Sequence, residues 1–205
     1  MTDATRIQPL LDQYDHAIER LSIRLGGGAF DSGDGAPIDV PQLTTPEYLW
    51  EPVDGCWSVR RRSTGPGFRA TALSGSGEWG IDAANAPHPY PPPFTTIAWR
   101  LSHLTELLLL RADYTVGTHT LTRQGFEARG TATEALADFT TAAAAWRLAL
   151  RDTDDDAFDE VGRCTYPYGS DADDSFSDVA WWVNQEVLHH GAEIALLRDL
   201  YRELG

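Results

Sequence analysis

AWWVNQEVLHHGAEIALLRDLY, residues 180–201, is the stretch that decides the fold, because its apolar residues recur at the spacing of a long amphipathic helix. Steps of three and four residues join most members of this apolar stripe, and residues on both sides of the stretch extend it. The stripe consists of Phe176, Val179, Val183, Val187, Ile194, Leu197, Tyr201 and Leu204. The pattern predicts a helix that faces the protein core.

Two chemically active side chains fall on the core-facing side of this predicted helix. His190 fills the step between Val187 and Ile194, and Glu186 lies four residues before it, one turn away. Burying either group without a partner costs on the order of several kcal/mol. Three interpretations stay open: a structural hydrogen bond between the two residues, an acid–base pair in a cleft, and a pair of metal ligands completed by a donor elsewhere.

Length and composition indicate a globular protein. The 205 residues suffice for one hydrophobic core, and we expect a single domain over residues 1–205. No apolar run approaches the ~20 residues of a membrane span. Residues 1–6 lack the basic-then-apolar layout of a signal peptide. We therefore expect a cytoplasmic protein with no membrane partner.

The charge and the cysteines narrow the functional classes. The formal net charge is -15 and all 16 basic side chains are arginines, so the surface repels phosphate backbones and we expect no nucleic-acid partner. The one basic cluster, residues 60–62, is too small to change this expectation. Cys56 and Cys164 form neither a C-x-x-C motif nor a disulfide framework, so both are expected to be reduced.

Three helices carry clear start or stop signals. Residues 5–25 show the helical apolar spacing, and the glycines at 26–28 end it. Thr131-Ala-Thr-Glu is a capping-box pattern that opens a later helix, which the acidic run 152–156 ends. Ser175 or a neighbouring aspartate is expected to cap the final helix.

A further helix is predicted over residues 94–112. The prolines before it prevent an earlier start, and Thr95 or Thr96 begins it. His103 lies within one of its apolar stripes, with apolar neighbours one turn away on either side. A histidine on such a face must be hydrogen-bonded or liganded, so His103 is the candidate third donor to join Glu186 and His190.

The rest of the chain is predicted to consist mainly of segments that connect the helices. Residues 26–45 and 60–93 are rich in Gly and Pro, and short strands could lie around residues 68–73. Thr45 and Pro46 are expected to begin a short helical turn between the two connections. Four amphipathic helices without a repeated strand signal predict an all-α fold: a four-helix bundle with a long crossover between helices 1 and 2.

His103 and the motif Glu186-x-x-His189-His190-Gly191 make the chain resemble the DinB-like, or YfiT-like, family of metal-binding four-helix bundles. The segments EYLWEPVDGCWSVR (47–60), TTIAWRLSH (95–103) and residues 184–201 extend the resemblance over nearly the whole chain. The usual family pattern has H-x-x-x-H on the last helix. Glu186 replaces its first histidine, as in the His/Glu/His site of the related mycothiol-dependent maleylpyruvate isomerases.

The resemblance implies His103, Glu186 and His190 as metal ligands, whereas His189 points about 100° round the helix. Such a donor set suits zinc first, and nickel or another divalent ion is also compatible. Three protein ligands leave a position open for water or substrate. By resemblance, we expect a metal-dependent thiol S-transferase or isomerase that acts with a low-molecular-weight thiol on a small electrophilic molecule. No further catalytic residue is predicted.

Two other functions stay open. One is a non-catalytic bundle with a structural or vestigial metal site, acting as a dimeric stress or binding protein. A fourth protein ligand such as His16 or His88 would favour it. The other is an interaction module, because the adjacent Trp181 and Trp182 point in different directions and one of them can lie at a dimer surface. The family resemblance implies a homodimer.

Overall fold

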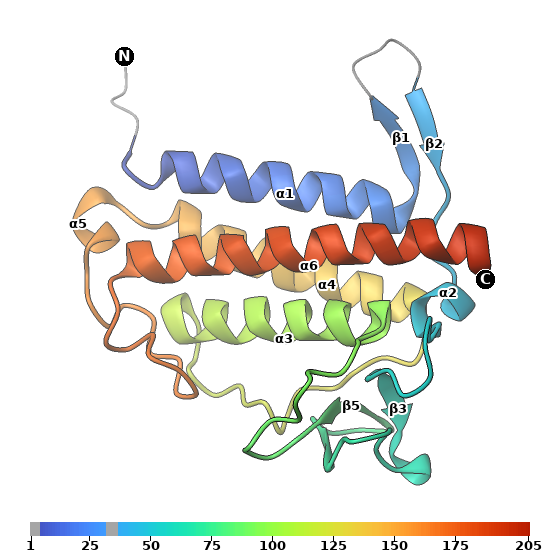
Figure 1. Ribbon diagram of the computed structural model, residues 1–205. Coiled ribbons are helices and arrows are strands. Elements are labelled where there is room, and N and C mark those ends of the chain that lie inside the picture. The colour runs from blue at the N-terminus through green and yellow to red at the C-terminus, as the bar shows by residue number, and fades with distance from the viewer. Residues whose placement is uncertain (1–4, 32–36) are drawn as a thin grey trace.

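Four long helices form the body of the protein (Figure 1). The structure is a computed structural model that describes residues 5–31 and 37–205. The long helices are α1 (Gln8–Gly26), α3 (Ile97–Val116), α4 (Ala132–Arg151) and α6 (Phe176–Leu204). Helices α1 and α3 each pack against both α4 and α6, so the four enclose one core. Two short helices, α2 (Thr45–Leu49) and α5 (Asp155–Phe158), complete the helical part.

Side-chain caps set where the helices begin. Three predicted caps are confirmed, because each hydroxyl accepts a hydrogen bond from a backbone N–H in the first turn of its helix: Thr96, Thr131 and Ser175. Helix α2 begins one residue earlier than expected. Thr44 is its cap and accepts from the backbone N–H of Glu47, so Thr45 is already helical.

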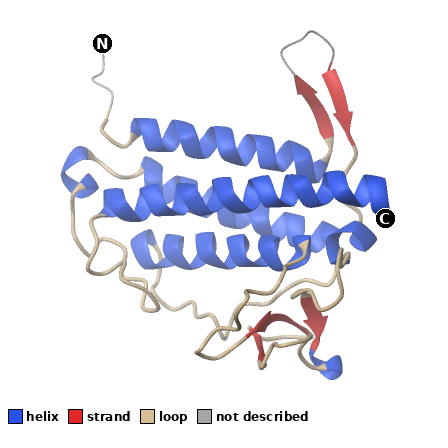
Figure 2. Ribbon diagram, in the orientation of Figure 1, coloured by secondary structure: helices blue, strands red, loops and turns tan. Residues whose placement is uncertain are grey.

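The expectation of an all-α chain is wrong in one region, the crossover, which we define as residues 27–96 between α1 and α3. Two small antiparallel sheets lie there (Figure 2). The first pairs β1 (Gly28–Asp31) with β2 (Pro37–Val40), where a plain connection was expected; residues 32–36 of that stretch lie outside the described residues. The second has the order β3-β5-β4 and rests on α3. Its strands are β3 (Val59–Arg61), β4 (Ala72–Ser74) and β5 (Trp79–Ala83), and a single 3₁₀ turn, η1 (Arg62–Thr64), follows β3.

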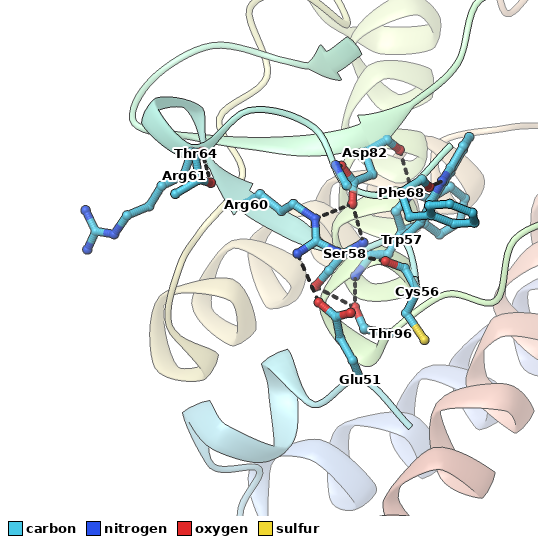
Figure 3. A network of polar contacts seen from close by, with 12 residues as sticks. Glu51, Cys56, Trp57, Ser58, Arg60, Arg61, Thr64, Phe68, Asp82 and Thr96 are labelled. Atoms are coloured by element: carbon cyan, nitrogen blue, oxygen red, sulfur yellow. Dashed lines mark hydrogen bonds and ion pairs between the residues drawn. The ribbon is translucent and has the colours of Figure 1, made fainter. Parts of the chain in front are cut away.

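The second sheet is held by one buried carboxylate. Asp82, only 1% exposed, accepts hydrogen bonds from the backbone N–H groups of Ser58 and Gly67, at 2.9 and 2.7 Å, and from Arg60 Nε at 2.7 Å. Figure 3 shows Arg60 reaching from Asp82 to Glu51, with which it forms an ion pair at 3.0 Å. Strands of three to five residues bury little apolar surface, so these charge-assisted bonds supply much of the order in the sheet.

The core contains an ion pair whose arginine is fully buried. Arg198 of α6 is 0% exposed and forms two hydrogen bonds with the Glu47 carboxylate, Nε to Oε1 at 2.6 Å and Nη2 to Oε2 at 3.1 Å. The pair fixes α2, which lies between the two sheets of the crossover in the sequence, against the last turns of α6.

No helix among the described residues combines the length and the hydropathy that a membrane crossing requires.

Candidate metal centre

His103 of α3 meets Glu186 and His190 of α6 where these two helices pack together. One donor atom from each side chain lies within 4.8 Å of the donor atoms of the other two. The Nε2 atoms of His103 and His190 lie 3.2 and 3.4 Å from the same oxygen, Glu186 Oε2. In the described part of the chain, no fourth His, Cys, Asp or Glu joins the group. The structure therefore brings together the three residues that the family resemblance implied.

The spacing of the donor atoms suits a shared divalent ion. Two ligands at 2.0–2.1 Å from a tetrahedral zinc ion lie about 3.3 Å apart. The two nitrogen–oxygen separations, 3.2 and 3.4 Å, match this value. The side chains of His103, Glu186 and His190 are 27%, 20% and 18% exposed, so solvent reaches all three. Three protein donors leave one position of a tetrahedral ion for a further, non-protein ligand.

The ring of His190 faces more acceptors than a neutral imidazole has protons. Its Nδ1 lies 2.7 Å from Glu193 Oε2 and its Nε2 lies 3.4 Å from Glu186 Oε2. An ionised carboxylate only accepts hydrogen bonds, and a neutral imidazole carries a single N–H. Both contacts are satisfied either by a doubly protonated ring or by a cation between Nε2 and Oε2. The donor set therefore fits a bound cation.

The protonation states at the cluster favour metal binding. Burial lowers the pKa of His103 below its ordinary value, although the hydrogen bond to Glu186 opposes this change. The hydrogen bond from His103, together with the nearby His190 ring, holds the pKa of Glu186 well below its usual range. An ionised carboxylate beside a neutral imidazole is what a metal ion requires of its ligands.

Trp99 lies against both histidines. Its indole stacks on the His103 ring, with centroids 5.3 Å apart and planes at 19°, and meets the His190 ring edge-on at 6.4 Å. The indole N–H donates to the backbone carbonyl of Asp82 at 2.9 Å. Trp99 is one of the apolar neighbours that the sequence pattern placed one turn from His103. That pattern gave no sign that the crossover sheet would hold the indole in place.

Three charged residues close to the cluster were missed by the sequence analysis. Glu193 contacts His190, Arg100 pairs with Glu193, and Glu106 lies one turn beyond His103. Burial raises the pKa of Glu106, and Arg123 Nε lies 3.6 Å from its Oε1 atom. Each of the three stands three residues from a predicted ligand, and this helical spacing is the signal that could have identified them.

The other histidines lie apart from the cluster. His16 is exposed in a groove between α1 and α6, and His88 and His189 are also exposed. Neither His16 nor His88 supplies a fourth ligand to the group. His119 lies in the connection after α3, where its Nδ1 is 3.3 Å from Thr165 Oγ1. The two cysteines are free, as expected, and both are buried.

A helical body with a His/Glu/His donor set between α3 and α6 defines a class of bundles suited to metal binding. The sequence profile described as the DinB superfamily matches residues 79–194, more than half of the chain. The matched range runs from β5 into α6 and includes His103, Glu186 and His190. The chain belongs to the DinB superfamily. No curated protein and no solved structure matches it.

Proposed function

We propose that the protein binds one divalent metal ion through His103, Glu186 and His190 and acts as a thiol S-transferase or isomerase on a small electrophilic molecule. The observation that carries the metal site is the His190 ring, whose two nitrogens face carboxylate oxygens at 2.7 and 3.4 Å. Two imidazole nitrogens and one carboxylate oxygen suit zinc best, and nickel is compatible.

Each residue has a defined part in the proposal. His103 and His190 hold the ion with Nε2, and Glu186 holds it with Oε2. A divalent ion in this position favours the thiolate form of a low-molecular-weight thiol, which is the nucleophilic form. The partial exposure of the three side chains gives a thiol access to the centre. Trp99 shields one face of the His103 ring.

The choice of thiol rests on the resemblance to mycothiol-dependent isomerases, which share the His/Glu/His set. Mycothiol is therefore the first thiol to test. A homodimer, a cytoplasmic location and a single domain over residues 1–205 stay predictions.

The structure offers an argument against the non-catalytic alternative. A structural zinc site is closed, with four protein ligands. The cluster has three candidate donors within the described residues, and all three side chains keep solvent exposure. These features are those of an open centre, which favours catalysis over a purely structural metal.

A screen of thiols and electrophiles tests the proposal. The protein, loaded with zinc or nickel, is assayed with mycothiol, glutathione or cysteine against chlorodinitrobenzene and against maleylpyruvate. We expect turnover that requires both metal and thiol, is lost in His103→Ala and is kept in His16→Ala. Full metal occupancy without turnover of any pair would contradict the enzyme proposal and support a non-catalytic bundle.

A further inference from the structure

Glu193 links His190 to a buried arginine on the neighbouring helix. Its Oε2 atom lies 2.7 Å from His190 Nδ1, one turn earlier on α6. The same oxygen forms an ion pair with Nη1 of Arg100, in the first turn of α3. Because a carboxylate cannot donate, the contact at Nδ1 requires that this nitrogen carry the proton. The His190 ring is therefore held by a hydrogen bond at Nδ1, the nitrogen that faces away from Glu186.

Arg100 is fixed more firmly than its partner. Its side chain is 10% exposed, whereas that of Glu193 is 45% exposed. Arg100 Nε donates to the backbone carbonyl of Thr95 at 3.4 Å, and its guanidinium lies 5.9 Å from the Phe94 ring centre. Burial lowers the pKa of Arg100 to about 10. A charge buried at this cost needs a counter-ion, and Glu193 supplies it.

We propose that Arg100 and Glu193 are a positioning pair for His190. Glu193 accepts the Nδ1–H and so selects the tautomer in which the Nε2 lone pair faces the cluster. Arg100 keeps the Glu193 carboxylate from turning into solvent. The inference rests on the proposed metal site, since a carboxylate on the outer nitrogen of a ligating histidine fixes the ring and increases its basicity. Neither residue touches the ion.

The two histidines are thus oriented by different means. The His103 ring is held by stacking on Trp99, which sets the plane of the ring. The His190 ring is held by a charged hydrogen bond, which sets both its plane and its protonated nitrogen. Loss of Glu193 therefore changes the chemical state of His190, an effect that loss of packing alone would not produce.

The first test uses metal-free protein and so does not depend on the proposed function. Long-range ¹H–¹⁵N correlation spectra at a pH where histidines are neutral report which ring nitrogen is protonated, and a His190→Gln spectrum assigns the signals. We expect Nδ1–H in the wild type, Nε2–H in Glu193→Ala, and Nδ1–H again in Glu193→Gln, whose amide oxygen can still accept. A wild-type His190 protonated at Nε2, or a tautomer unchanged in Glu193→Ala, would contradict the positioning role of Arg100 and Glu193.

The second test measures zinc affinity by competition with a chromophoric chelator. Removing an outer partner of a metal-bound histidine weakens binding about 10–100-fold, and we expect a loss in this range for Glu193→Ala and a smaller one for Glu193→Gln. The matched control is Asp199→Ala, which removes an α6 carboxylate that contacts Arg24 and no residue of the cluster. Its affinity should equal that of the wild type.

The outcomes separate the two proposals. If the wild type binds zinc tightly and Glu193→Ala binds it equally well, the positioning role is wrong and the metal site stands. If the wild type does not bind zinc, the proposed function fails, while the tautomer spectra still decide whether Arg100 and Glu193 position the ring.

Discussion

Trp99 and His103 lie face to face, with ring centroids 5.3 Å apart and planes 19° from parallel. The indole N–H of Trp99 is bonded to the carbonyl of Asp82 in β5. One side chain therefore joins the crossover sheet to the candidate metal centre. The crossover supports the site as well as connecting two helices, and its stability should influence how His103 is presented.

The position of Trp99 predicts a fluorescence signal. Co²⁺ bound at His103, Glu186 and His190 lies within a few ångströms of this indole, and an ion with a partly filled d shell quenches a neighbouring indole. We expect Co²⁺ to reduce the emission of the wild type and to have a much smaller effect on Trp99→Phe. Trp50→Phe is the control, because Trp50 packs on Tyr201 instead. Equal quenching in Trp99→Phe and wild type would place the ion elsewhere.

Asp82→Ala should destabilise the protein. It removes the acceptor of two backbone N–H groups and of Arg60, and unpaired buried groups cost about 1–3 kcal/mol each. Allowing for relaxation, we expect the free energy of unfolding to fall by roughly 2–4 kcal/mol in urea denaturation. The exposed Asp54→Ala is the control. A loss as small as that of the control would mean that the carboxylate does not order the sheet.

The buried pair of Glu47 and Arg198 gives a second stability prediction. Glu47→Ala leaves the fully buried Arg198 charge without its partner, which costs about 3–5 kcal/mol. The double variant Glu47→Leu, Arg198→Met should recover much of this loss, because it removes both charges. Breaking the exposed Arg24–Asp199 pair should change the free energy of unfolding by less than about 1 kcal/mol. A Glu47→Ala protein as stable as wild type would contradict this account of the core.

The cluster also predicts a pH dependence for the metal-free protein. The folded pKa of His103 lies below its ordinary 6.5, and that of Glu186 lies below its ordinary 4.5. In both cases the unfolded chain binds protons before the folded chain does as the pH falls, so the free energy of unfolding decreases. This decrease begins at about pH 6.5 for His103 and at about pH 4.5 for Glu186.

Variants isolate these two contributions. The stability of the wild type relative to His103→Gln should fall below about pH 6.5, and its stability relative to Glu186→Gln should fall below about pH 4.5. Urea midpoints measured across this range provide the test. Differences that stay constant, or that grow as the pH falls, would show that the two groups are not held in these protonation states.

The helices were predictable because their signals are local. Thr96, Thr131 and Ser175 each act on the N–H three residues further on, so the caps can be read in the chain itself. The sheets were not predictable in this way. Strands of three residues are too short to show alternation, and the bonds that order them join Asp82 to Ser58, 24 residues away.

The candidate site also has a part that local sequence signals predict and a part that depends on the tertiary structure. His103, Glu186 and His190 lie on faces whose apolar spacing marks them, and the family resemblance connects the two helices. The contact between Arg100 and Glu193 depends on how α3 and α6 are placed against each other. Helical spacing puts each residue near its own histidine. Only the tertiary structure puts them near each other.

Metal content is the most direct measurement of the central claim. The protein, purified without a metal-affinity step, is dialysed against zinc and analysed for bound metal together with His103→Ala and His16→Ala. We predict about one ion per chain in the wild type and in His16→Ala, and a large loss in His103→Ala. Wild type and His103→Ala with the same metal content, whether near zero or near one, would contradict a centre built from His103, Glu186 and His190.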